Sequence, residues 1–115
     1  LAANGAVTVV SAAGTWTTAA TTTSSGPGAV AITGAIHEIT TTGTGDALTL
    51  ADGAEGQHLY VVYVAEAAGG DTAVCTPTNL AGASTTITFN ALGDTADLLF
   101  TAGAWYFLGG AAALA

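Results

Sequence analysis

The chain has 115 residues, which is enough for one domain with a single hydrophobic core but not for two. It carries eight Asp and Glu residues and no Lys or Arg, a net charge of −8, so no Lys or Arg side chain can neutralise a phosphate backbone. We therefore expect no nucleic-acid partner, and the single cysteine, Cys75, excludes a disulfide within the chain.

The N-terminal part of the chain alternates β-branched with small residues, a pattern typical of strands. Residues 6–11 (AVTVVS) and 15–23 (TWTTAATTT) predict the first two strands. The Ser-Ser-Gly-Pro-Gly sequence at 24–28 predicts a turn, because Gly and Pro favour backbone angles that a central strand cannot use. Two further strands are expected at 29–33 and 36–41.

The middle of the chain contains the strongest strand signal. A short strand is expected at 47–50 (ALTL), between two Gly-Asp or Asp-Gly turns. Residues 58–65 (HLYVVYVA) follow, and their unbroken Leu, Tyr and Val predict a central strand that is buried on both faces. A strand at 72–76 and a loop at 77–83 come next.

The C-terminal part predicts three more strands, at 85–90, 96–101 and 104–108. Ala and Gly at 102–103 predict a tight hairpin between the last two. The Ala-rich tail, residues 109–115, can form a helical turn or an arm, and its apolar character suggests that it lies on a neighbouring subunit.

Together the elements predict an all-β protein: an antiparallel β-sandwich or barrel-like (jelly-roll-type) single domain. It spans residues 1–115, with 1–5 and 109–115 as possible arms. Because much of the apolar half of the chain is Ala, the core is expected to be thin, and burial in a homo-oligomer would compensate for it. The sequence shows no basic, apolar leader and no apolar tract long enough for a bilayer, so we expect neither a signal peptide nor a membrane partner.

Two Asp residues are the weak candidates for a calcium site. Asp46 and Asp94 each follow a Gly, and an Ile-Thr pair precedes each Gly-Asp, which suggests two similar hairpins facing each other. Calcium prefers oxygen ligands. Asp beside Gly is also the ordinary chemistry of a tight turn, and we favour that interpretation. We therefore expect no metal and no cofactor.

The sequence indicates no catalytic residue. His37 and Glu38 are neighbours in an expected strand, so their side chains point to opposite faces and cannot share a site. No nucleophile, base and orienting group stand out together, and the chain is expected not to be an enzyme.

Three aromatic residues are the interface candidates: Trp16, Trp105 and Tyr106. Trp105 and Tyr106 are adjacent in a strand, so we expect one to enter the core and the other to contact a subunit. Exposed aromatic rings would also suit a carbohydrate-binding module, which stays open as an alternative.

The order of several short motifs resembles a module of structural proteins of tailed bacteriophages. The motifs are Leu-Thr-Leu-Ala-Asp-Gly at 48–53, Glu-Gly-Gln at 55–57, Thr-Pro-Thr-Asn-Leu-Ala-Gly at 76–82 and Gly-Ala-Trp-Tyr at 103–106. The resemblance covers somewhat more than half of the chain.

The resemblance implies a non-enzymatic virion protein at the outer surface of the particle. A capsid decoration (cement) protein that binds and stabilises the major capsid protein shell is the function we expect. It would be a homo-oligomer, and we expect a trimer. The alternatives are a phage head or tail fibre and a subunit of an extracellular filament. Decoration proteins are usually thought to attach through basic side chains. This chain has no Lys or Arg and therefore differs from them in this respect.

Overall fold

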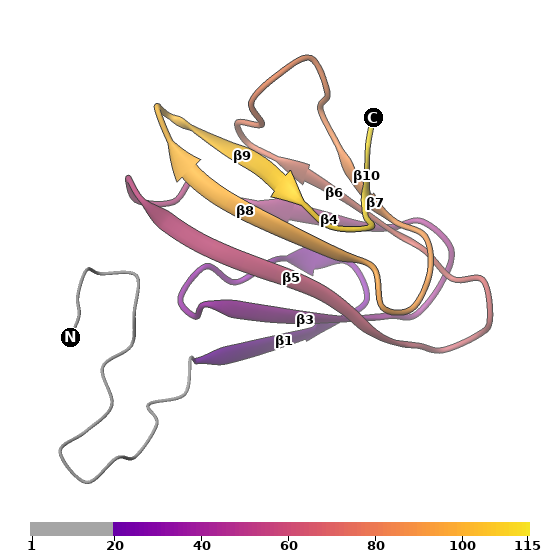
Figure 1. Cartoon of the computed structure of the whole chain (residues 1–115). Helices are drawn as coiled ribbons and strands as arrows, with labels where there is room; N and C mark the ends of the chain where they lie inside the picture. The colour runs from indigo at the N-terminus through magenta and orange to yellow at the C-terminus, as the bar shows by residue number, and fades with distance from the viewer. Residues whose placement is uncertain (1–19) are drawn as a thin grey trace, which may run out of the picture.

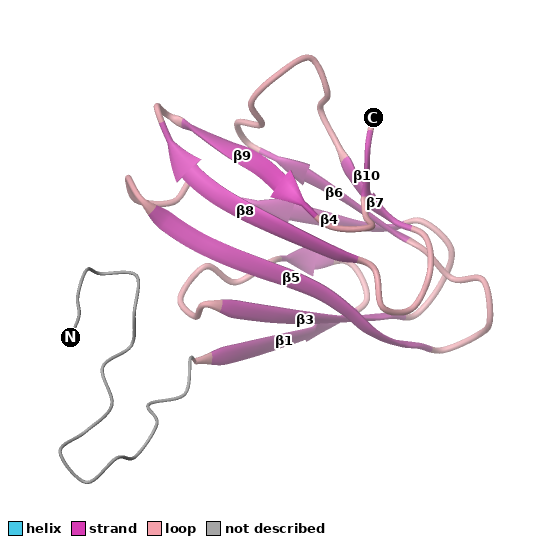
Figure 2. Cartoon of the chain, in the orientation of Figure 1, coloured by secondary structure: helices cyan, strands magenta, loops and turns pink. Residues whose placement is uncertain are grey.

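The computed structural model describes residues 20–115, and over this range the chain forms strands and loops without a helix (Figure 2). The strands are β1 (Thr21–Ser25), β2 (Gly28–Ala29), β3 (Ile36–Thr41), β4 (Asp46–Leu50), β5 (Gln57–Glu66), β6 (Ala73–Pro77), β7 (Ile87–Phe89), β8 (Thr95–Thr101), β9 (Ala104–Gly109) and β10 (Ala113–Leu114). The all-β prediction is confirmed. The strand expected at 6–11, the arm at 1–5 and Trp16 lie outside the described residues.

The ten strands form two five-stranded sheets. The first sheet has the order β1-β3-β5-β8-β9 and the second has the order β10-β7-β6-β4-β2 (Figure 1). From β1 to β6 the chain alternates between the sheets, so each pair of consecutive strands makes one coil that passes once through each sheet. Three such coils are stacked, and β7 to β10 complete the two sheets.

The stacked coils pair in parallel. In the first sheet β1 pairs with β3 and β3 with β5 in parallel, and in the second sheet β2 pairs with β4 and β4 with β6 in the same way. Parallel neighbours need a crossover, and here the strand in the opposite sheet supplies it. The predicted antiparallel pairing is therefore wrong for the four pairs among these six strands, so both sheets are mixed, and the strand order does not establish a jelly roll. Antiparallel pairs join β5, β8 and β9, and also β6, β7 and β10.

The corners of the coils are joined by hydrogen bonds between neighbouring coils. The amide of Gly26 donates to the carbonyl of Thr40 at 2.9 Å, and the amide of Ala67 donates to the carbonyl of Thr41 at 3.1 Å. The amide of Asp46 donates to the carbonyl of Thr72 at 3.0 Å. Each of these three amides is therefore satisfied by a corner of the adjacent coil.

The core lies between the two sheets and is built from their inward-facing side chains. Trp105 on β9 is its largest member and has no exposed surface. Its Nε1 donates to the carbonyl of Ala51 at 2.8 Å, and its ring meets Phe100 edge to face at 5.2 Å. The backbone of Trp105 also bonds to Asn79 and Ala81, which links the edge of the first sheet to the loop after β6.

β5 lies at the centre of the first sheet, as expected, but it is buried on one face only. Leu59, Val61 and Tyr63 are buried, whereas Tyr60 and Val64 are 44% and 45% exposed. The prediction of burial on both faces is wrong because no other layer of the described chain covers the outer side of this sheet. A run of apolar residues indicates a strand but does not show how many layers the sheet has.

The C-terminal tail is part of the second sheet. β10 pairs antiparallel with β7, and Ala112 before it is buried. Residues 109–115, expected as a helical turn or an arm, thus form a strand on their own chain. The expected hairpin between β8 and β9 is confirmed, with Ala102 and Gly103 both at positive φ, 54° and 81°, as a two-residue turn with matching twist requires.

The strand expected at 29–33 is much shorter in the structure. It is reduced to β2, Gly28–Ala29, after which the amide of Val30 still donates to the carbonyl of Thr49 in β4 at 2.8 Å. The chain then runs back towards β3 outside the named strands.

An exposed apolar face as candidate functional site

The outer side of the first sheet carries the largest group of exposed apolar side chains that share one surface. We call this surface the outer face. It comprises Ile36, Glu38, His58, Tyr60, Val62, Val64, Asp97, Leu99, Tyr106 and Leu108. The strand register places these side chains in adjacent rows: His58 pairs with Leu99 and Leu99 with Tyr106, while Ile36 pairs with Tyr60 and Tyr60 with Asp97.

Several members of the outer face are strongly exposed for apolar residues. Tyr60, Tyr106 and Leu108 keep 44%, 40% and 52% of their surface accessible. In β9, Tyr106 and Leu108 alternate with Trp105 and Phe107, which pack into the core. Single exposed apolar residues are ordinary, but a group on adjacent strands of one sheet indicates a contact surface.

A polar pair lies within the outer face. The His58 ring stacks on Tyr60, with centroids 5.4 Å apart and planes inclined by 8°, and its Nε2 lies 3.2 Å from Oδ1 of Asp97. That oxygen of Asp97 is buried and makes no well-aligned hydrogen bond. The Asp97 side chain as a whole is still 36% exposed, so a donor from a partner can reach the carboxylate at its exposed side.

The other acidic residues are used within the chain. Five of the eight accept a hydrogen bond from a described backbone or side-chain donor: Asp46, Asp52, Glu55, Asp71 and Asp94. Oε1 of a sixth, Glu66, lies 3.3 Å from the hydroxyl of Tyr63, which donates to the carbonyl of Asp71. The remaining two, Glu38 and Asp97, accept none from a described residue, and both lie on the outer face. Glu38 and Asp97 are thus on the same surface as the exposed aromatic rings.

The two calcium candidates use their oxygens to stabilise turns. Oδ2 of Asp46 accepts the amide of Thr42 at 2.7 Å, and Oδ2 of Asp94 accepts the amide of Asn90 at 2.8 Å, four residues upstream in each case. These turns are corners between the sheets and not hairpins, because neither β3 and β4 nor β7 and β8 pair with each other. Within residues 20–115, no group of three or more His, Cys, Asp or Glu side chains is placed to hold a metal ion.

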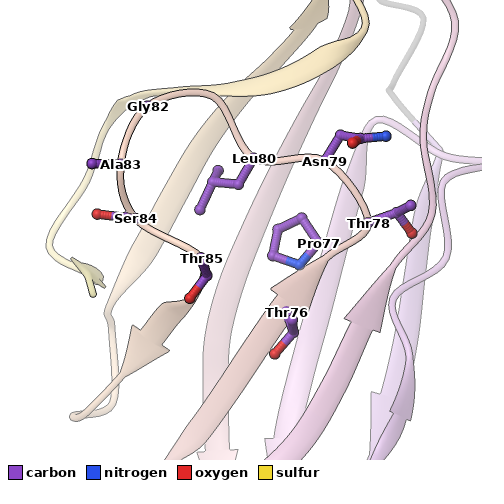
Figure 3. Close-up of a pocket in the computed structure, with 9 residues that line it drawn as sticks. All are labelled: Thr76, Pro77, Thr78, Asn79, Leu80, Gly82, Ala83, Ser84 and Thr85. Atoms are coloured by element: carbon purple, nitrogen blue, oxygen red, sulfur yellow. The ribbon is translucent and has the colours of Figure 1, made fainter.

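A hollow of about 380 Å³ lies beside the loop after β6. Figure 3 shows this loop arching past Pro77, with Leu80 on its inner side. It is lined by Thr76, Pro77, Thr78, Asn79, Leu80, Gly82, Ala83, Ser84 and Thr85. The lining has no aromatic ring and no titratable group, so it offers neither stacking for a sugar nor an acid or base.

Two groups that could carry chemistry are buried in the core. Nδ1 and Nε2 of His37 lie 2.7 Å and 2.9 Å from the hydroxyls of Thr22 and Ser24, and burial lowers the pKa of this histidine. Burial also raises the pKa of the Cys75 thiol to about 12. A neutral imidazole and a protonated thiol, both enclosed, suit structural roles.

Tyr63 is a third buried polar group. Its hydroxyl lies 2.8 Å from both the Thr41 hydroxyl and the carbonyl of Asp71, to which it donates. Burial, the largest of several causes, raises the pKa of Tyr63. The side chain thus links the corners of two adjacent coils.

The structure separates the predicted interface residues. Trp105 is entirely enclosed by its own chain, so its assignment to an interface is wrong; it is the member of the pair that enters the core. Tyr106 is exposed on the outer face, and Trp16 lies outside the described residues. Sequence analysis missed Tyr60 and Leu99 as surface residues, although strict alternation along β5 and β8 would have placed them there.

Comparison with protein-family models, with curated proteins and with solved structures found no match. Among residues 20–115, no helix has the length and apolar character needed to cross a membrane.

Proposed function

We propose that the chain is a non-enzymatic structural protein of a bacteriophage virion, and that it decorates the outer surface of the capsid. In this role it binds and stabilises the shell of the major capsid protein. The proposal combines the order of the motifs at 48–53, 55–57, 76–82 and 103–106 with the architecture of the chain.

The observation that carries the proposal is the outer face. A small domain that presents Tyr60, Tyr106 and Leu108 on one sheet has a ready surface for a protein neighbour. Five of the eight carboxylates, by contrast, are used within the chain, where they accept hydrogen bonds from turns and loops. This distribution of apolar and acidic side chains favours binding to another protein over catalysis.

Self-association, with a trimer as the first expectation, belongs to the same proposal. Among the described residues, β1 and β9 are the edge strands of the first sheet and β10 and β2 are those of the second, so the edges of β1 and β2 at one end of the coils are open to pairing. β1 has the sequence Thr-Thr-Thr-Ser-Ser, without the charges or proline that commonly protect an edge strand. A copy of the chain could therefore associate at these edges while the outer face contacts the shell.

A phage fibre or extracellular filament is the second candidate, and the stacked coils favour it. Parallel coils with open edges at one end can be continued by a neighbouring molecule along the stacking direction, and open head-to-tail contacts produce fibres.

Electron microscopy of the native particle distinguishes these functions. Antibodies against the purified chain, bound to phage particles and visualised at a resolution that locates each copy, are expected to label the icosahedral shell. Labelling along a tail or fibre would favour the second candidate. Particles without label, from a stock whose genome encodes the chain, would contradict both the capsid role and the phage fibre.

A further inference from the structure

The two acids of the outer face constrain what can cover it. Glu38 pairs in register with Val62, and Asp97 pairs with Tyr60, so both carboxylates lie among apolar side chains. Any partner that covers the apolar side chains also removes these carboxylates from water. An ionised carboxylate buried without a cation or a donor is strongly unfavourable.

A second copy of this chain cannot supply the missing cations. The whole sequence has no Lys or Arg and only two histidines. His37 is enclosed in the core, and His58 already lies beside Asp97. Face-to-face packing of two copies would moreover bring Glu38 and Asp97 of both molecules together, because a two-fold contact joins the same surface to itself.

We infer that the outer face binds a protein of different sequence that inserts Lys or Arg side chains, flanked by apolar residues, between Glu38 and Asp97. The inference rests on the proposed function, for which it names the contact surface and the chemistry of the partner. Arginine suits this position, because its planar group pairs with carboxylates and stacks on aromatic rings such as Tyr60 and Tyr106. Self-association then belongs to other surfaces.

Peptide binding to the ¹⁵N-labelled full chain tests the inference. The probes are three short synthetic peptides of equal length in which Leu alternates with Arg, with Ser or with Glu. The Leu-Arg peptide is expected to shift the amide signals of β5, β8 and β9 on the outer face. The Leu-Ser peptide should bind much more weakly, and the Leu-Glu peptide should not bind.

Matched variants separate the outer face from general attraction to an acidic protein. The double variant Glu38→Gln with Asp97→Asn is expected to lower the affinity for the Leu-Arg peptide at least about tenfold, because loss of a desolvated charge pair weakens binding by that factor or more. Asp52→Asn removes one charge elsewhere and should change the affinity less than about twofold. Tyr106→Ser should weaken binding, whereas Leu92→Ser, in the exposed turn before β8, should not.

Several results would overturn the inference. These are equal binding of the Leu-Ser and Leu-Arg peptides, equal losses in Asp52→Asn and in the double variant, and no binding of any peptide. Concentration-dependent shifts of the outer face without peptide would identify a second copy as its occupant. If the virions are labelled but the outer face binds no peptide, this inference fails and the proposed function stands. If the virions are unlabelled but the outer face binds the Leu-Arg peptide, the proposed function fails and this inference stands.

Discussion

His37 has an unusual position, because its imidazole faces the core and both ring nitrogens are held by hydroxyls of β1. A pKa lowered by burial means that the unfolded chain binds a proton more readily than the folded chain. The free energy of unfolding is therefore unaffected well above the unfolded pKa of about 6.5, and it falls as the pH drops through that value towards the lower folded pKa.

We expect denaturant unfolding to show a loss of stability between neutral pH and about pH 5, the range below the ordinary histidine pKa but above that of most carboxylates. The His37→Gln variant should lack this pH dependence, whatever its free energy of unfolding at neutral pH. His58→Gln, which changes an exposed histidine, should leave it in place. A pH dependence that survives in His37→Gln would assign it to another group.

Two adjacent glycines at the end of β9 offer a matched test of packing. A Cβ at Gly110, where φ is +121°, would lie 2.0 Å from the carbonyl oxygen of Thr95, whereas a Cβ at Gly109 would meet nothing within 4 Å. Gly110→Ala is expected to destabilise the protein by at least about 2 kcal/mol through backbone strain and overlap.

Gly109→Ala is the control and should stay within about 0.5 kcal/mol of the parent. Both variants can be measured by urea unfolding. Equal stability of the two would show that the chain near Thr95 relaxes around the added methyl group.

The last strand is short, yet it completes an edge of the second sheet. The carbonyl of Ala115 accepts the amides of Thr85 and Thr86, and the amide of Ala112 donates to Thr95. Removal of residues 111–115 loses these bonds and exposes β7, at a cost of at least about 2 kcal/mol if each bond contributes about 1 kcal/mol.

The truncated chain is expected to unfold at lower urea concentration, with its oligomeric state unchanged in size-exclusion chromatography coupled to light scattering. Leu114→Ala changes only an exposed side chain and should have little effect. Loss of an oligomer without loss of stability would instead support the expectation that this tail lies on a neighbour.

Strand positions were largely predictable from the sequence, and strand partners were not. The alternation of apolar residues located β4, β5, β6, β8 and β9 to within a few residues. The relative direction of paired strands could not be predicted. Alternation shows which face of a strand is buried, and it is the same for parallel and antiparallel neighbours. The Gly-Asp turns at 45–46 and 93–94 also look like hairpin turns, although they carry the chain from one sheet to the other.

The candidate site was predictable only in part, for a related reason. Adjacent residues Trp105 and Tyr106 had to face opposite sides, but the sequence did not say which of them entered the core. Tyr60 and Leu99 are distant in sequence, and only the pairing of β5, β8 and β9 assembles the outer face. A site formed by residues on several paired strands can be predicted only once the pairing of those strands is known.

The whole molecule carries charge of one sign. With a net charge of −8 and no Lys or Arg, long-range interactions between its surface charges are repulsive, apart from those of a protonated histidine. Added salt shortens the screening length from about 30 Å at 0.01 M to about 10 Å at 0.1 M and weakens this repulsion.

We therefore expect the melting temperature at pH 7 to rise by a few degrees as sodium chloride increases from about 0.01 to 0.3 M, which spans this change in screening. Differential scanning calorimetry measures it directly. Because salt lowers the stability of proteins held by surface ion pairs, a melting temperature that falls with salt would contradict a purely repulsive surface.

The coil arrangement also bears on how such a chain can lengthen in evolution. Each coil adds one strand to each sheet in the same direction, so duplication of a coil at the β1 and β2 end would extend both ladders and keep every side chain on its face. The antiparallel strands and Trp105 lie at the other end and would be untouched. Variants of this architecture should therefore differ by whole coils, with the C-terminal part constant.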